Sequence, residues 1–170
     1  MNIEIRKATK DDAAAIEKIA IAAWNHTHVP NIDQEQVDYM LERIYTVDAL
    51  HKAMDENEVF LIISGISDGQ NEFKPAGYLS YIMKTEELYF INKLYIHPVS
   101  HCKGFGTALL DEAVRILKSL KVKTIQLHVN ENNFKAIKFY EKYGFKALQL
   151  DHYPFEKYII HDYLMELGLG

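Results

Sequence analysis

The chain has 170 residues, 48% of them hydrophobic, and its 19 Lys and Arg side chains are outnumbered by 24 Asp and Glu, which gives a formal net charge of −5. This length suits one domain with one shared core, and the hydrophobic content is too high for a disordered chain. The acidic balance gives no support to general nucleic-acid binding and favours a cationic or amine-bearing partner. A single cysteine excludes an intramolecular disulfide, and no stretch is apolar enough for a secretion signal or membrane span, so we expect a cytoplasmic protein.

The first 55 residues predict one strand followed by helices. Apolar and polar residues alternate at the start, as in a half-buried strand, and apolar residues then recur at three- and four-residue spacing, as in amphipathic helices. Pro30 breaks the first helix. In chain order we expect a strand at residues 3–6, a cap at 9–12, a helix from there to Trp24, a helix at 33–44 and one further helical turn at 47–54.

Residues 58–166 predict a sheet with two helices. Three consecutive strands form an antiparallel meander, with a hairpin loop at residues 67–71, and the helix after the third strand gives one strand-helix-strand crossover. The expected strands are 59–63, 75–83, 87–96, 124–129, 145–150 and 158–166, and the expected helices are 104–120 and 133–143. We therefore predict a single α+β domain over residues 1–170, with a mixed, mostly antiparallel sheet of seven strands flanked by helices.

The segment 94–108 runs from a strand through a loop to the start of a helix. Unpaired N–H groups at a helix start bind anionic oxygen, and Gly104 and Gly106 allow the backbone to approach a phosphate closely. Lys103 adds positive charge. The alternative is a tight loop in which glycine only permits an unusual φ. A dinucleotide fingerprint would need Gly or Ala where Leu109 stands, and the Gly-Lys-Ser/Thr of a P-loop is absent.

Two motifs resemble signatures of the GNAT superfamily of N-acetyltransferases. His101-Cys102-Lys103-Gly104-Phe105-Gly106 is similar to its acetyl-CoA loop, Gln/Arg-x-x-Gly-x-Gly/Ala, with His101 at the usual Gln or Arg position. The segment 133–145 is similar to its second signature, Asn-x-x-Ala-x-x-x-Tyr-x-x-x-Gly-Phe. The resemblance covers residues 75–165, whereas the first 55 residues resemble only the looser amine-site region, and the Tyr-rich end resembles the bacterial polyamine-acetylating branch.

The resemblance implies a GNAT fold, in which a splayed strand pair holds acetyl-CoA as cosubstrate. It implies that the main chain of the strand lines the pantetheine arm, that the loop holds the pyrophosphate and that Tyr140, two helical turns after Asn133, is the general acid for the departing thiolate. The cofactor-binding residues it implies are Leu94, Tyr95, Ile96, His101, Cys102, Lys103, Gly104, Phe105, Gly106, Thr107, Asn133 and Tyr140.

The implied activity is direct transfer of an acetyl group to a primary amine, which is a small amine, a polyamine or a protein amino group. The alternative is a catalytically silent acyl-CoA-binding regulatory module on the same fold. A primary amine is only about one part in a thousand neutral at pH 7, so a base must take its proton. In many relatives a Glu on the strand before the loop takes it, often through water, but residues 89–93 hold no carboxylate. Glu86, Glu87, His26, His28 and His97 are titratable but favour surface roles, so the base stays unassigned.

Further residues have two interpretations each. An aromatic and histidine set either lines the amine cleft or packs in the core, and it consists of Trp24, His26, His28, Tyr39, Tyr45, Tyr153 and Tyr158. Cys102 beside Lys103 has the surroundings of a reactive thiol, although a bound cofactor would cover it. Zinc-type spacing is missing, so we expect no metal. GNAT relatives are often dimers, and the aromatic-rich C-terminal strand is compatible with a homodimer.

Overall fold

The computed structural model describes residues 2–28, 32–66 and 72–170. The break expected at Pro30 and the hairpin loop expected at residues 67–71 lie outside the described residues. Within the described residues, no helix is long and apolar enough to cross a membrane.

The architecture is the expected α+β domain built on one seven-stranded mixed sheet. The strands lie in the order β1-β2-β3-β4-β5-β7-β6, and all neighbours are antiparallel except β4 and β5. The elements are β1 (Ile3–Lys7), η1 (Lys10–Asp12), α1 (Ala13–Thr27), α2 (Gln34–Ile44), α3 (Val47–Asp55), β2 (Val59–Gly65), β3 (Lys74–Met83), β4 (Leu88–Ile96), η2 (Pro98–Ser100), α4 (Phe105–Ser119), β5 (Thr124–Asn130), α5 (Phe134–Tyr143), β6 (Lys146–Phe155) and β7 (Tyr158–Gly168).

Several elements extend past their expected ends, and the largest extension is in β6. The helical turn expected at 47–54 is the helix α3, whose N-terminus is capped by the Thr46 side chain, which accepts a hydrogen bond from the Ala49 N–H at 3.3 Å. The strand expected to end at Leu150 continues to Phe155 as β6. Pro154 is tolerated there because β6 is the edge strand, where a missing N–H need not break a ladder.

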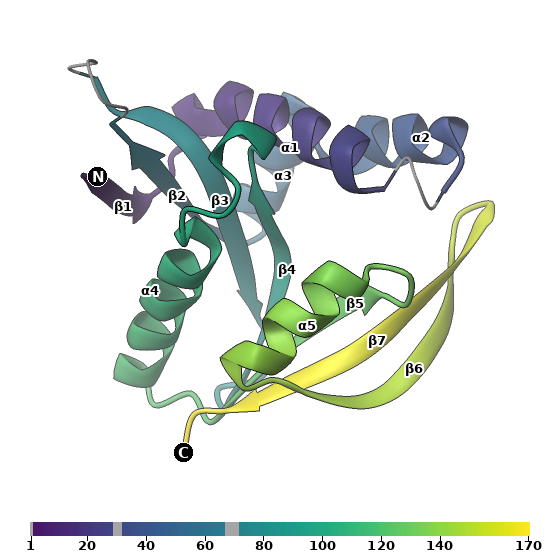
Figure 1. Ribbon diagram of the computed structural model, residues 1–170. Helices are drawn as coiled ribbons and strands as arrows, with labels where there is room; N and C mark the ends of the chain where they lie inside the picture. The colour runs from purple at the N-terminus through teal and green to yellow at the C-terminus, as the bar shows by residue number, and fades with distance from the viewer. Residues whose placement is uncertain (1, 29–31, 67–71) are drawn as a thin grey trace.

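The sheet separates two hydrophobic cores (Figure 1). On β2, Leu61 and Ile63 pack on the side of α4 and α5, whereas Phe60 and Ile62 pack against α1, α2 and α3 on the other side. This period-two alternation explains why residues 59–63 are apolar without interruption. The β6–β7 hairpin extends beyond both cores toward α2 (Figure 1).

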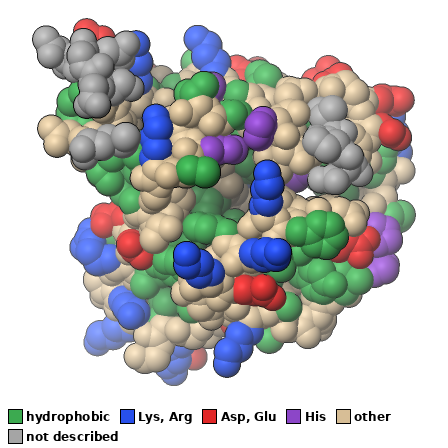
Figure 2. Space-filling view, viewed as in Figure 1, with side chains coloured by type: hydrophobic (Ala, Val, Ile, Leu, Met, Phe, Trp, Pro, Cys, Tyr) green, Lys and Arg blue, Asp and Glu red, His purple; other side chains and the backbone are tan. Residues whose placement is uncertain are grey.

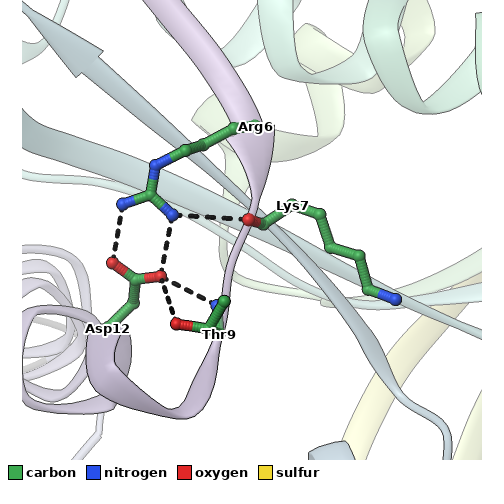
Figure 3. Close-up of polar contacts among 4 residues, drawn as sticks. All are labelled: Arg6, Lys7, Thr9 and Asp12. Atoms are coloured by element: carbon green, nitrogen blue, oxygen red, sulfur yellow. Dashed lines mark hydrogen bonds and ion pairs between the residues drawn. The ribbon is translucent and has the colours of Figure 1, made fainter.

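A cluster at Asp12 fixes the entry into α1 (Figure 3). Its carboxylate accepts hydrogen bonds at 2.8 Å from both terminal guanidinium nitrogens of Arg6 and at 2.8 Å from the Thr9 N–H. The bond from Arg6 is the main reason that the pKa of Asp12 is lowered. The cluster joins the end of β1 to the start of α1, and so orients the helix that supplies one wall of the site.

Candidate active site

The site begins where β4 and β5 separate. Only Leu88–Ile91 of β4 pairs with Thr124–Leu127 of β5, although β4 continues to Ile96 and β5 to Asn130. The β3–β4 register shifts at the same level, because Ser80 pairs with Lys93 and Tyr81 with Ile91, which leaves Asn92 as the extra residue of a β-bulge. Such a bulge bends its strand. Past Asn92, the edge of β4 that faces β5 has no pairing with that strand, and two cavities open there.

The larger cavity has a volume of about 750 Å³ and lies between the end of β4, the start of α4 and α5. We call it the cofactor cavity. Every expected cofactor residue lines it except Lys103, and the lining is Ala23, His26, Thr27, Leu94, Tyr95, Ile96, Ser100, His101, Cys102, Gly104, Phe105, Gly106, Thr107, Asn132, Asn133, Phe134, Lys135, Ala136, Phe139 and Tyr140. None of these described residues carries a carboxylate. Figure 2 shows Lys, Arg and His side chains around a hollow on this face of the molecule.

The two loop glycines serve different purposes. Gly104 has a φ of +77°, and a Cβ there would meet no atom within 4 Å, so its backbone conformation is what requires glycine. Gly106 has helical geometry, but a Cβ there would lie 3.2 Å from the Phe139 ring, so it permits close approach of α4 and α5. The first α-helical bond of α4 runs from the Ala108 N–H to the Gly104 carbonyl, which leaves three N–H groups free to point out of the helix start.

His101 is turned toward its own strand. Its Nε2 lies 2.9 Å from the Ile96 carbonyl oxygen, where it donates the N–H, and its ring lies 5.3 Å from that of His26. This bond holds the loop against the end of β4. With Nε2 used in this bond, His101 binds an anion only through Nδ1, and only when that nitrogen is also protonated.

The smaller cavity has a volume of about 340 Å³ and lies on the other side of the strand gap. We call it the acceptor cavity. Its walls come from α1, α2, β4, β5, α5 and the β6–β7 hairpin, and its lining is Trp24, His28, Ile32, Gln36, Met40, Ile44, Tyr45, Phe90, Ile91, Asn92, Lys93, Leu94, Tyr95, Leu127, His128, Val129, Asn130, Asn133, Ala136, Tyr140, Tyr153, Phe155, Ile160 and Asp162. Four members of the expected aromatic and histidine set are here: Trp24, His28, Tyr45 and Tyr153.

The other members of that set lie elsewhere. His26 lines the cofactor cavity. Tyr39 and Tyr158 contact each other edge to face at 5.5 Å, where α2 meets the hairpin, and Lys157 joins them by an ion pair of 2.9 Å with Glu35. These contacts join α2 to the hairpin, and none of the four residues lines the acceptor cavity.

The two cavities share five residues: Leu94, Tyr95, Asn133, Ala136 and Tyr140. Tyr140 is buried in α5, and burial raises the pKa of its phenol, which therefore stays protonated at neutral pH. Among the residues that the structure describes, no hydrogen-bond partner is found for its hydroxyl. Asn133 caps α5 by accepting the Ala136 N–H at 3.2 Å. A protonated donor thus stands where the cavities meet.

The sequence pattern of the acetyltransferase (GNAT) family matches residues 14–145, most of the chain, and the splayed strand pair fits it. The chain belongs to the GNAT acetyltransferase family. Its members transfer acyl groups from acetyl-CoA, so this protein is an acetyl-CoA-dependent acyltransferase.

Individual relatives differ in the acceptors that their names state. The chain is 27% identical over 156 residues to spermidine N(1)-acetyltransferase of Thermoplasma acidophilum, covering 89% of this chain and 92% of the relative. Its fold is similar to that of the PaiA N-acetyltransferase of the same organism in complex with coenzyme A, with a TM-score of 0.82, 24% identity and 99% of each chain covered. It is also similar to the ribosomal-protein-S18-alanine N-acetyltransferase of Escherichia coli, with a TM-score of 0.73, 19% identity and coverage of 99% and 94%.

The acceptor cavity of this GNAT protein holds charged groups that the sequence did not single out. Lys93 and Glu58 form a buried ion pair of 2.6 Å, and Ser80 donates to the same carboxylate oxygen at 2.5 Å. Asp162 is buried on β7, and the Tyr153 hydroxyl donates to it at 2.7 Å. Charged residues are rarely buried, so a charged residue at an inward-facing position of a strand is a sequence signal for a functional group. Asp162, which alternates with Ile160 and Leu164 on β7, carries this signal.

Two histidines, His28 and His128, also line the acceptor cavity. Burial lowers the pKa of His28 to about 4, and its Nε2 is buried with no hydrogen-bond partner in the described part of the chain. His128 bonds through Nε2 to Asp151 at 2.9 Å, and its ring stacks on Tyr153 with centroids 5.3 Å apart. The earlier candidates on the loop before β4 lie outside the site: Glu87 pairs with Lys123 on the surface, and Glu86 is exposed. No group of three or more His, Cys, Asp or Glu among the described residues is placed to hold a metal ion.

Proposed function

We propose that this GNAT protein acetylates a primary amine of a small, unbranched cationic molecule of the polyamine class. The observation that carries this proposal is the meeting of the two cavities at Tyr140, in the gap between β4 and β5. A thioester from the cofactor cavity and an amine from the acceptor cavity would meet there without crossing bulk solvent. The spermidine-acetylating relative from T. acidophilum supports the same acceptor class.

The cofactor cavity suits a polyanionic cosubstrate. The free N–H groups at the start of α4 would bind the pyrophosphate, and Lys103 and Lys135 would add positive charge at the rim. The unpaired edge of β4 at Leu94, Tyr95 and Ile96 would hydrogen-bond the pantetheine arm through its main chain, as a strand would. Asn133 would contact the cofactor from the start of α5, with its remaining amide group as donor.

The shape of the acceptor cavity favours a thin amine. Its volume of about 340 Å³ is partly enclosed by the contacts of the β6–β7 hairpin with α2, and much of its lining is aromatic. Aromatic faces attract organic cations, and apolar walls accommodate methylene chains. The small volume of this cavity favours a slender amine over a bulky protein acceptor.

The chemical step requires three contributions. The neutral amine attacks the thioester carbon, main-chain N–H groups near the Asn92 bulge would hydrogen-bond the oxyanion, and the C–S bond breaks as the thiolate takes the proton of the Tyr140 hydroxyl. Burial makes Tyr140 a weaker acid, but the same dry surroundings destabilise the thiolate, so proton transfer as the bond breaks is favoured.

A thiol-release assay with an amine panel tests the proposal. With acetyl-CoA present, we expect saturable release with spermidine, spermine and putrescine, and much slower release with lysine or with a peptide N-terminus. Preferred acetylation of the peptide would overturn the acceptor class. Calorimetric binding of acetyl-CoA without thiol release from any amine would instead favour the silent module.

A further inference from the structure

We infer that Asp162 binds the acceptor ammonium group in the acceptor cavity and takes its proton before the amine attacks. This inference rests on the proposed function and assigns the base that the motifs leave open. Asp162 is the only carboxylate among the described residues that line either cavity, and only 8% of it is exposed.

The place of Asp162 in the sheet puts it beside the transfer point. It pairs on β7 with Asn130, the last residue of β5, where the gap beside β4 is open. The Tyr95 phenol, which both cavities share, has a pKa raised first by burial, and the Tyr45 phenol, the Tyr140 phenol and the Asp162 carboxylate add to this shift. Asp162 and Tyr140 therefore both line the acceptor cavity and both act electrostatically on the same buried phenol, so we place the acceptor amine in the part of the cavity that they share with Tyr95.

The other charged groups of the acceptor cavity are less suited to this role. The Lys93 ammonium is already paired with Glu58, so it neither binds a cation nor accepts a proton. His28 is held neutral, with a pKa of about 4, and is a weak base for that reason. His128 uses Nε2 for its bond to Asp151.

The surroundings of Asp162 make it a stronger base than an ordinary carboxylate. Burial is the main cause and raises its pKa above the ordinary 3.8, whereas the bond from Tyr153 opposes this. Asp151 from β6 raises its pKa further, and His128 from β5 and His161 from β7 lower it. An ammonium group that enters the cavity would supply the counter-ion that this buried carboxylate lacks, since an uncompensated buried charge is costly.

The proton balance follows. An ammonium group enters with three protons and leaves as an amide with one. Asp162 takes the first proton and passes it to solvent after turnover. The second leaves the nitrogen after attack and restores the Tyr140 hydroxyl, whose own proton has gone to the coenzyme A thiolate.

Asp162→Asn tests the assignment because Asn keeps the size of the side chain and still accepts the Tyr153 hydroxyl. We expect kcat/KM for spermidine to fall about 10²-fold or more at pH 7, with the affinity for acetyl-CoA unchanged. The variant must use the rare neutral amine, so its kcat/KM should rise roughly tenfold per pH unit from pH 7 to 9, whereas the wild type should be level there. A structural role alone would not produce this slope.

Asp151→Asn is the matched control, since Asp151 pairs with Asp162 across β6 and β7 but does not line the cavity. We expect it to keep the wild-type pH profile. The inference would be overturned if Asp162→Asn had the same kcat/KM and the same pH profile as the wild type. It would also be overturned if the steep pH profile appeared in His128→Gln instead of in Asp162→Asn. If the wild type releases no thiol with any amine, the proposed function fails. Titration of spermidine into the coenzyme A complex then still tests the binding part, because Asp162→Asn should weaken it and unchanged affinity would refute it.

Discussion

The two cavities of this GNAT protein share five lining residues, but the rest of their linings differ in chemical character. The cofactor cavity is bounded by main-chain N–H groups at a helix start, small residues and basic side chains, and none of its described lining residues is acidic. The acceptor cavity is lined by aromatic rings, by Lys93, whose charge is neutralised by Glu58 outside the lining, and by the buried carboxylate of Asp162. The net charge of −5 hides this division, which in the function we propose would separate an anionic cosubstrate from a cationic acceptor across about one strand's width. The variants below should therefore disturb one cavity and spare the other, except for one variant at the residue that both cavities share.

Glu58→Gln should have the largest effect. It leaves the Lys93 ammonium buried without its counter-ion, while the glutamine oxygen still accepts from Ser80. We expect the free energy of unfolding to fall by about 3–5 kcal/mol in urea denaturation, because an uncompensated buried charge is costly. The KM for spermidine should rise as the free ammonium repels the acceptor, with no change in acetyl-CoA affinity per folded molecule.

The double variant Glu58→Gln/Lys93→Met provides the control for that prediction. Replacing both charges should recover much of the lost stability, since no unpaired ion remains. If the single variant is as stable as the wild type, the ion pair does not support the cavity wall.

Tyr140→Phe should act at the junction. We expect kcat to fall by about 10²-fold, the scale of one general acid, because the thiolate loses its proton donor. The affinities for acetyl-CoA and for spermidine should change little, since the ring remains. Stopped-flow or steady-state thiol release checks the rate, and calorimetry checks the affinities. A variant with wild-type kcat would remove Tyr140 from the chemical step.

Sequence patterns predicted the two cavities unequally well, for a physical reason. The cofactor cavity is made mainly by two contiguous segments, 94–107 and 132–140, with a smaller part from the end of α1, and in these segments glycine φ, helix starts and spacing are local properties. The acceptor cavity draws on α1, α2, β4, β5, α5 and the β6–β7 hairpin, so Asp162 and Tyr140 line one cavity only because of the strand order and the gap after Asn92. The extension of β6 to Phe155 went unpredicted, and it forms the hairpin that supplies Tyr153. The strand and helix order itself was confirmed.

His28, which lines the acceptor cavity only, should make the free energy of unfolding depend on pH. Its pKa is about 4 when folded and near 6.5 when unfolded, so between these values the unfolded chain binds the extra proton. The stabilisation is complete above pH 6.5 and is lost as pH falls toward 4, with a loss of about 2 kcal/mol at pH 5. Urea denaturation at pH 7 and pH 5 measures it, and His28→Phe should reduce the difference by that amount. An unchanged difference in His28→Phe would mean that other groups cause it.

Gly104→Val should give the smallest of these effects, confined to the cofactor cavity. The φ of +77° costs a residue with a side chain about 1–2 kcal/mol, and the open space around the Cβ means that strain is the only penalty. If the loop relieves this strain by moving its N–H groups away from the pyrophosphate, affinity for acetyl-CoA falls about tenfold, since 1.4 kcal/mol corresponds to that factor. Gly168→Val is the matched control, because Gly168 also has open space but no positive φ. Equal acetyl-CoA affinity in the two variants would show that the loop backbone does not hold the phosphates, whereas a loss in Gly104→Val with unchanged spermidine affinity would confirm that the two cavities act independently.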